Sequence, residues 1–176
     1  MTGGPFDAII RQMGPGTAEQ KAGRPEKESG MIIRPMKIED YDKVYALWES
    51  CKGMGLSSAD DSREGIEKYL KRNPHTCFVA EEDGVLIGAI LGGHDGRRGH
   101  ISHAAVRQDL RRQGIGRALI DAVLEAMKAE GIVKVNFVVF KRNEEGNAFW
   151  EHLGFAARED LVYRDKVLIA YERKDT

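Results

Sequence analysis

The stretch from residue 99 to residue 130 constrains most strongly how this chain folds. It begins with an apolar run of strand type, GHISHAAV, over residues 99–106. A helix is expected from about Gly114 to Glu130, because apolar residues recur there at helical spacing. Its apolar face would consist of Ile115, Leu119, Val123 and Met127. A strand that enters a helix through a loop with glycines at 114 and 116 indicates an α/β fold.

Further elements on both sides extend this unit to a mixed, mostly antiparallel sheet with flanking helices. We expect strands at MIIRPM from Met31 and at VKVNFVVF over 133–140. The expected helices start at Ile38, near 61–72 and at 143–154, and two strands turn at Asp83-Gly84. A closing hairpin is expected around Arg164 to Lys166. Residues 1–30 are rich in Gly, Pro and charge and predict a flexible extension, so the domain would comprise 31–176.

Composition excludes several classes of function. Lys plus Arg number 27 against 28 Asp plus Glu, so the net charge of -1 does not favour nucleic-acid binding. No apolar run is long enough to span a bilayer, and none near the start resembles a signal peptide, so we expect no membrane association. Cys51 and Cys77 lack metal-ligand spacing, which predicts no metal and two reduced thiols in a cytoplasmic protein.

The glycines of LRRQGIGRAL, residues 110–119, predict an anion site. A helix N-terminus exposes unpaired N–H groups and the positive end of the helix dipole, and glycine lets an anion approach the backbone. Arg111, Arg112 and Arg117 add positive charge. The Walker pattern is absent, and the dinucleotide pattern fails because residue 119 is Leu instead of Gly.

What fits is R-x-x-G-x-G from Arg111 to Gly116, and this loop resembles that of the GNAT superfamily of N-acetyltransferases. A second pattern of that family, N-x-x-x-x-A-x-[aromatic]-x-x-x-G-F, matches Asn143, Ala148, Trp150, Gly154 and Phe155. The resemblance covers residues 31 to about 173. Within the family, the chain looks like a bacterial subgroup of YpeA-like proteins. The resemblance implies a sheet of about seven strands in which the fourth and fifth, here 99–106 and 133–140, splay apart.

The same resemblance implies which residues bind the acetyl-CoA co-substrate. Backbone groups of the strand end would pair with the pantetheine arm, amides of the loop would hold the pyrophosphate, and one asparagine would contact the cofactor. The strand-end residues are Ala104, Ala105 and Val106, and the asparagine is Asn143. The loop residues are Arg111, Arg112, Gln113, Gly114, Ile115, Gly116, Arg117 and Ala118.

Acetylation of a protonated amine requires a base, and imidazole titrates nearest neutrality. His100 and His103 lie on the strand and would face opposite sides unless a bulge intervenes. The resemblance favours His100, and His94, Asp95 and Glu81 are alternatives with surface roles as the default. Direct transfer in a ternary complex would need no cysteine nucleophile.

The group that protonates the thiolate is open. The family usually places Tyr where this chain has Trp150, and an indole is no acid at neutral pH. Trp150 would then shape the site or pack, while Tyr163 or water donates the proton.

The acceptor would be a small-molecule amine or a protein amino group, held by CKGMGLSSADDS, residues 51–62, and the final hairpin. Asp60 and Asp61 would attract the amine or cap a helix. Two other functions stay open: a non-catalytic acyl-CoA-binding module, and a nucleotide-binding fold for ATP or NAD. A homodimer is possible.

Overall fold

The structure is a computed structural model that describes residues 30–176. The extension expected over residues 1–30 therefore falls, apart from Gly30, outside the described residues. In chain order the elements are β1 Ile32–Pro35, η1 Ile38–Asp40, α2 Tyr41–Ser50, β2 Gly55–Ser57, α3 Arg63–Arg72, β3 Phe78–Glu82, β4 Val85–His94, β5 Gly99–Val106, η2 Gln108–Leu110, α4 Ile115–Ala129, β6 Val135–Asn136, α5 Glu144–His152 and β7 Arg173–Asp175. No helix within the described part is both long and apolar enough to cross a membrane.

The central sheet has five strands in the order β1-β3-β4-β5-β6, and β2 and β7 form a separate pair. All strand pairs are antiparallel except β5 with β6. The turn between β3 and β4 uses Asp83 and Gly84, both with positive φ, as the hairpin pattern predicts. The expected fold class, a mixed and mostly antiparallel α/β sheet, is confirmed, and residues 30–176 contain seven strands divided between two sheets.

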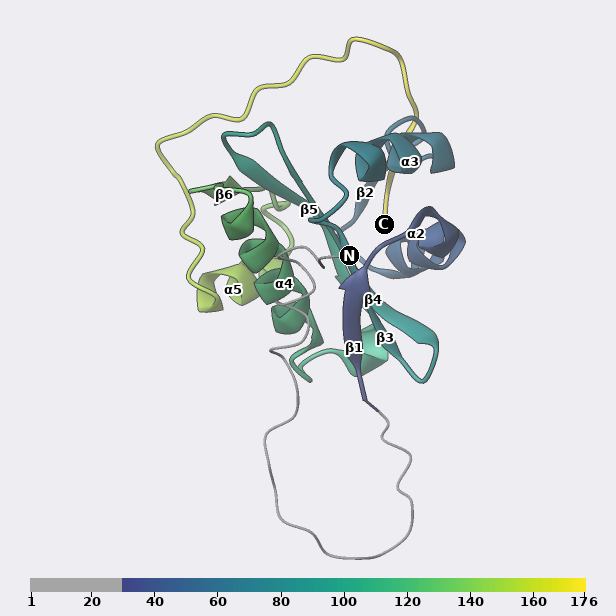
Figure 1. The fold of residues 1–176 in the computed structure, drawn as a ribbon. Coiled ribbons are helices and arrows are strands. Elements are labelled where there is room, and N and C mark those ends of the chain that lie inside the picture. The colour runs from purple at the N-terminus through teal and green to yellow at the C-terminus, as the bar shows by residue number, and fades with distance from the viewer. Residues whose placement is uncertain (1–29) are drawn as a thin grey trace, which may run out of the picture.

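Helices cover both faces of the central sheet (Figure 1). The helices α4 and α5 pack on one face, and α2 and α3 lie on the other. Strand β3 serves both cores, because Val79 belongs to the α2 side and its neighbours Phe78 and Ala80 to the α4 side. The alternation of strand residues thus gives two apolar cores, and a residue's position along a strand decides which helices it meets.

Two expectations about the last third of the chain are wrong. The apolar run over 133–140 is paired only at β6, and no hairpin forms around Arg164 to Lys166. Residues 155–172 contain no strand and arch past the sheet to β7, which pairs with β2 instead (Figure 1). Strand propensity is realised only where a partner edge is available, and a hairpin without a third strand is marginally stable.

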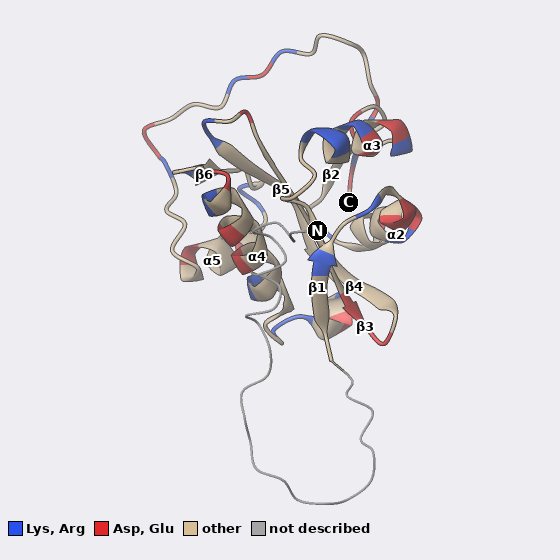
Figure 2. Ribbon diagram, viewed as in Figure 1, with Lys and Arg blue, Asp and Glu red and all other residues tan. Residues whose placement is uncertain are grey.

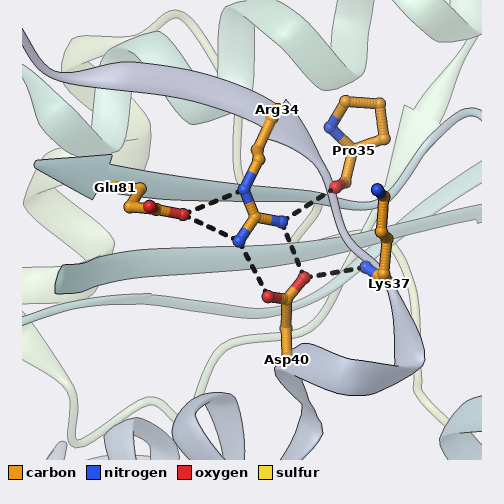
Figure 3. Close-up of polar contacts among 5 residues, drawn as sticks. All are labelled: Arg34, Pro35, Lys37, Asp40 and Glu81. Atoms are coloured by element: carbon orange, nitrogen blue, oxygen red, sulfur yellow. Dashed lines mark hydrogen bonds and ion pairs between the residues drawn. The ribbon is translucent and has the colours of Figure 1, made fainter. Parts of the chain in front are cut away.

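A charged cluster ties β1 to η1 and β3 (Figure 3). The Arg34 guanidinium donates to both carboxylate oxygens of Asp40, over 2.7 and 2.8 Å, and to Glu81 over 2.8 and 2.9 Å. The amide of Lys37 also donates to Asp40. Burial raises the pKa of Asp40, but the hydrogen bonds from Arg34 and Lys37 outweigh it and hold this pKa below its ordinary value. Glu81, one of the alternative bases, is thus engaged by Arg34.

Candidate active site

The two strands expected to splay do part in the structure. β5 and β6 pair in parallel only at Gly99 with Val135 and at His100 with Asn136. β5 then continues to Val106, whereas residues 137–140 leave the sheet. Beyond His100, no strand of the described part pairs with the β6-facing edge of β5. Main-chain groups along this edge, including those of Ala104 and Ala105, are therefore placed where an extended ligand can pair with them.

The loop that follows β5 ends in a set of unpaired amides. Within the described residues, none of the amides from Arg112 to Arg117 donates to an internal carbonyl, and the first bond of α4 runs from Ala118 to the carbonyl of Gly114. Residues 111–114 are exposed. Gly114 has φ +85° and Arg112 φ +63°, so the chain turns sharply before the helix begins. Such a turn aims several N–H groups at one point and suits a phosphate.

Positive charge surrounds the same turn, as Figure 2 shows for the loop before α4. Arg117 is paired only loosely, since its Nε lies 3.8 Å from Asp121. Arg111 lies 3.5 Å from Glu145 and from the carbonyl oxygen of Val106. These long contacts leave the guanidinium groups able to bind an anion.

Of the two loop glycines, only Gly116 is required by close packing. A Cβ on Gly116 would lie 3.2 Å from the ring of Phe149, whereas a Cβ on Gly114 would meet nothing within 4 Å. Gly116 thus also lets α4 approach α5. Gly114 is required by its positive φ alone.

Asn143 is placed as a helix cap. Its side-chain oxygen accepts from the amide of Gly146 at the start of α5. The same side chain lies against Gly53, where an added Cβ would come within 2.9 Å of its nitrogen. Asn143 therefore links α5 to the loop 51–62, and its expected contact with the cofactor stays a prediction.

A bulge in β5 changes the direction of His103 relative to His100. Ala105 pairs with Ala89 and Ser102 with Leu91, so His103 and Ala104 together face the single residue Ile90. His103 has φ +51°, an unusual conformation for a residue other than glycine.

The two histidines have different environments. His103 packs edge-on against Trp48 on the α2 side, at 4.7 Å between ring centroids, and its Nε2 lies 2.9 Å from Asp61 Oδ1. His100 is exposed where β5 meets β6, with Nδ1 3.0 Å from the side-chain oxygen of Asn136.

The two aromatic candidates, Trp150 and Tyr163, do not contact His103. Trp150 is buried among Phe137, Phe149 and Phe155, in the core on the α4 side, whereas His103 contacts the core on the opposite face. Tyr163 is 73% exposed within the arching segment 155–172. The structure does not bring either residue to His103, so neither is placed to protonate a leaving thiolate there.

The remaining candidates also have structural partners. His94 and Asp95 accept hydrogen bonds from amides of their own turn between β4 and β5. Cys77 is buried, and burial raises the pKa of its thiol to about 12, which disfavours a thiolate nucleophile. A pocket of about 250 Å³ lies elsewhere, lined by the end of α4 and residues 132–135 and 153–155. None of the candidate residues lines it.

Comparison with known proteins identifies this arrangement. A sequence profile described as the Acetyltransferase (GNAT) family matches residues 41–155. The chain belongs to the acetyltransferase (GNAT) family. This confirms the resemblance found in the sequence, and it makes the chain an N-acetyltransferase with acetyl-CoA as co-substrate. The YpeA-like subgroup stays a prediction.

A relative from Yersinia pestis (strain Pestoides F), named acetyltransferase, is 30% identical over 142 residues, which are 81% of this chain and 99% of the relative. Two solved structures share the fold, each with a TM-score of 0.64. One is AAC(6')-Iy with a bisubstrate analog, CoA-S-monomethyl-acetylneamine, at 21% identity, 79% of this chain and 99% of that one. The other is PaiA N-acetyltransferase from Thermoplasma acidophilum with coenzyme A, at 22% identity, 74% of this chain and 92% of that one.

Sequence reasoning missed two features of the site. The spacing of apolar and polar residues does not predict the strand β2 or its pairing with β7. It also does not distinguish Asp61 from Asp60. In the structure Asp61 is 4% exposed and touches His103, while Asp60 is exposed. Only the bulge and the return of the chain through β2 bring Asp61 and His103 together.

Proposed function

We propose that this protein transfers the acetyl group of acetyl-CoA directly to a primary amine in a ternary complex, with His103 as the general base. The main support for this proposal is the row of unpaired amides from Arg112 to Arg117, next to the open edge of β5. The pyrophosphate would bind these amides, as in the arrangement that helix N-termini provide for phosphates. The pantetheine arm would pair with the backbone of Ala104 to Val106.

The position of the acetyl group follows from this orientation. A carrier that binds the start of α4 and runs back along β5 brings its thioester to the bulge, where His103 lies. His100 is further along, at the point where β6 closes the edge. The geometry therefore favours His103 over His100. An amide at the bulge would stabilise the oxygen of the acetyl group as charge develops on it.

A small-molecule amine is the acceptor that best fits the comparisons. AAC(6')-Iy binds an acetylneamine analog, and a further neighbour at TM-score 0.58 is glucosamine-6-phosphate N-acetyltransferase from Arabidopsis thaliana. Their likeness to this chain is one of fold, so a protein amino group stays an alternative acceptor.

Release of free thiol from acetyl-CoA, measured with a panel of small amines, tests the reaction. We expect turnover with at least one primary amine and none with its N-acetylated form. Tight acetyl-CoA binding without turnover on any amine or peptide would instead indicate an acyl-CoA-binding module.

Thermal stabilisation tests the cofactor site without any acceptor. We expect acetyl-CoA to raise the melting temperature and NAD or ATP to leave it nearly unchanged, because only a ligand that binds the native state stabilises it. Arg112→Glu should weaken acetyl-CoA binding about tenfold or more, since it replaces a favourable charge with a repulsive one. Lys128→Glu, at the other end of α4, is the matched control and should leave the affinity unchanged.

A further inference from the structure

Two buried polar atoms without a hydrogen bond lie in neighbouring side chains of the site. Within the described residues, the only such side-chain atoms are His103 Nε2 and Trp48 Nε1. Unpaired buried polar atoms are costly, so each calls for a reason. For His103 the neighbouring carboxylate supplies the reason, because Asp61 Oδ1 lies 2.9 Å from Nε2 even though the N–H is not aligned on it. The pair is thus placed to attract most strongly when the imidazole carries a charge.

The carboxylate of Asp61 is itself fixed. Its Oδ2 accepts from the amide of Ser57 over 2.7 Å, and its own amide donates to the carbonyl of Ser57. The hydroxyl of Tyr41 donates to the carbonyl oxygen of Asp61 over 2.9 Å. One carboxylate oxygen is therefore held by the backbone of β2, and the other is presented to His103. Neither side chain can turn away without breaking contacts from two elements.

The ring of His103 is fixed from the other side as well. The bulge sets its backbone at positive φ, and Trp48 packs edge-on against the ring. Strain of this kind persists only where the surroundings over-determine it, and it is concentrated at functional sites. Because Nε2 faces Asp61, the nitrogen left for a substrate is Nδ1.

We propose that Asp61 is a positioning residue of the acetyl transfer: its carboxylate keeps the proton of neutral His103 on Nε2 and stabilises the imidazolium that forms when Nδ1 accepts a proton. This inference rests on the proposed function of His103. A carboxylate that holds one ring nitrogen directs the basic lone pair to the other.

The reaction balances with these groups alone. Nδ1 takes one proton from the substrate ammonium, which frees the lone pair of the amine nitrogen. That nitrogen bonds to the acetyl carbon, the bond from carbon to sulfur breaks, and the electron pair leaves with sulfur. The nitrogen then loses a second proton, which neutralises the thiolate directly or through water. His103 finally returns its proton to solvent.

Asp42, Glu64 and Arg63 are charged groups around Tyr41, whereas two tyrosines and a cysteine near the pair are neutral. Tyr41, from α2, has a pKa raised by burial, and Tyr69, from α3, has a pKa raised by burial to about 12 while its hydroxyl bonds to Ser102 on β5. Cys77 on the same face is a protonated thiol. Asp61 is therefore the charged group that touches the ring within the described residues.

The decisive variant is Asp61→Asn, which keeps an oxygen for the amide of Ser57 and removes the charge. We expect kcat/KM to fall about 10- to 100-fold, which is less than the loss of the general base itself, because His103 remains in place. Affinity for acetyl-CoA should stay unchanged. Asp83→Asn, on the exposed turn between β3 and β4, is the matched control and should leave both quantities unchanged.

A double-mutant cycle shows whether Asp61 acts through His103. His103→Asn is the suitable partner, since Asn tolerates positive φ. In that background Asp61→Asn should have almost no further effect on kcat/KM. A full additional loss would overturn the proposal, because it would mean that Asp61 supports the fold or the acceptor instead.

Nitrogen NMR of the His103 ring gives a readout that does not depend on activity. In the unmodified protein we expect the neutral ring to carry its proton on Nε2. A proton on Nδ1 would overturn the proposal even in an active enzyme. If the ring behaves as expected but no amine is acetylated, Asp61 still sets the tautomer of His103, and it is the proposed reaction that fails.

Discussion

Arg34→Met tests how much the charged cluster of Figure 3 contributes to stability. Arg34 binds two carboxylates at once, and the side chains of Arg34, Asp40 and Glu81 are 30%, 11% and 22% exposed. Removing one partner of a fully buried pair costs about 3–5 kcal/mol, while an exposed pair contributes at most about 1 kcal/mol. For this partly buried cluster we expect a loss of about 2–3 kcal/mol. Met keeps the apolar stem packed, so the change isolates the charge.

Urea denaturation at 25 °C and pH 7 measures this loss directly. For a domain of this size it corresponds to a fall of roughly 5–10 °C in melting temperature. Arg158→Met, which removes a pair with Asp160 on the surface, is the control and should leave the midpoint unchanged.

The loss should depend on pH in a defined direction. The pKa of Asp40 is held below its ordinary value, so its contribution is present above the unfolded pKa of about 3.9 and disappears as pH falls through the lower folded value. The gap between the unmodified protein and Arg34→Met should stay constant from pH 7 to about 5 and narrow below about 4. A loss under 1 kcal/mol at pH 7, or one that does not narrow in acid, would refute the electrostatic explanation.

Three further predictions follow from packing and burial. Cys77 should resist thiol reagents in the native protein at pH 8, because its pKa is raised to about 12, and mass-spectrometric mapping that finds it modified would contradict this. Gly92→Ala should destabilise by about 1–3 kcal/mol in urea, since its Cβ would lie 2.4 Å from the carbonyl oxygen of Thr76; an unchanged midpoint would show that β4 can shift there. Trp150→Phe should leave kcat/KM within a few-fold of the unmodified value, because the ring packs on Phe137 and its neighbours, and a large loss with intact stability would return Trp150 to the mechanism.

Local patterns determined much of the fold. The α4 helix is specified by apolar residues at helical spacing, and its start by Gly114, whose positive φ other residues adopt only with strain. The hairpin at Asp83-Gly84 and the cap of α3 at Ser62 are equally local. The turn that we propose to bind the pyrophosphate belongs to this class, because a glycine loop that opens a helix exposes its amides wherever the helix lies in the fold.

The tertiary structure alone decided which strands pair and which side chains meet. Residues 161–171 carry strand-forming side chains but have no partner edge, while the short segments β2 and β7 pair because the fold brings their ends together. Strict alternation along β5 would separate His100 from His103, and one bulge cancels it by turning His103 toward Trp48. The contact of His103 with Asp61 joins residues far apart in sequence, and no local spacing encodes such a contact, since it depends on how separate elements pack.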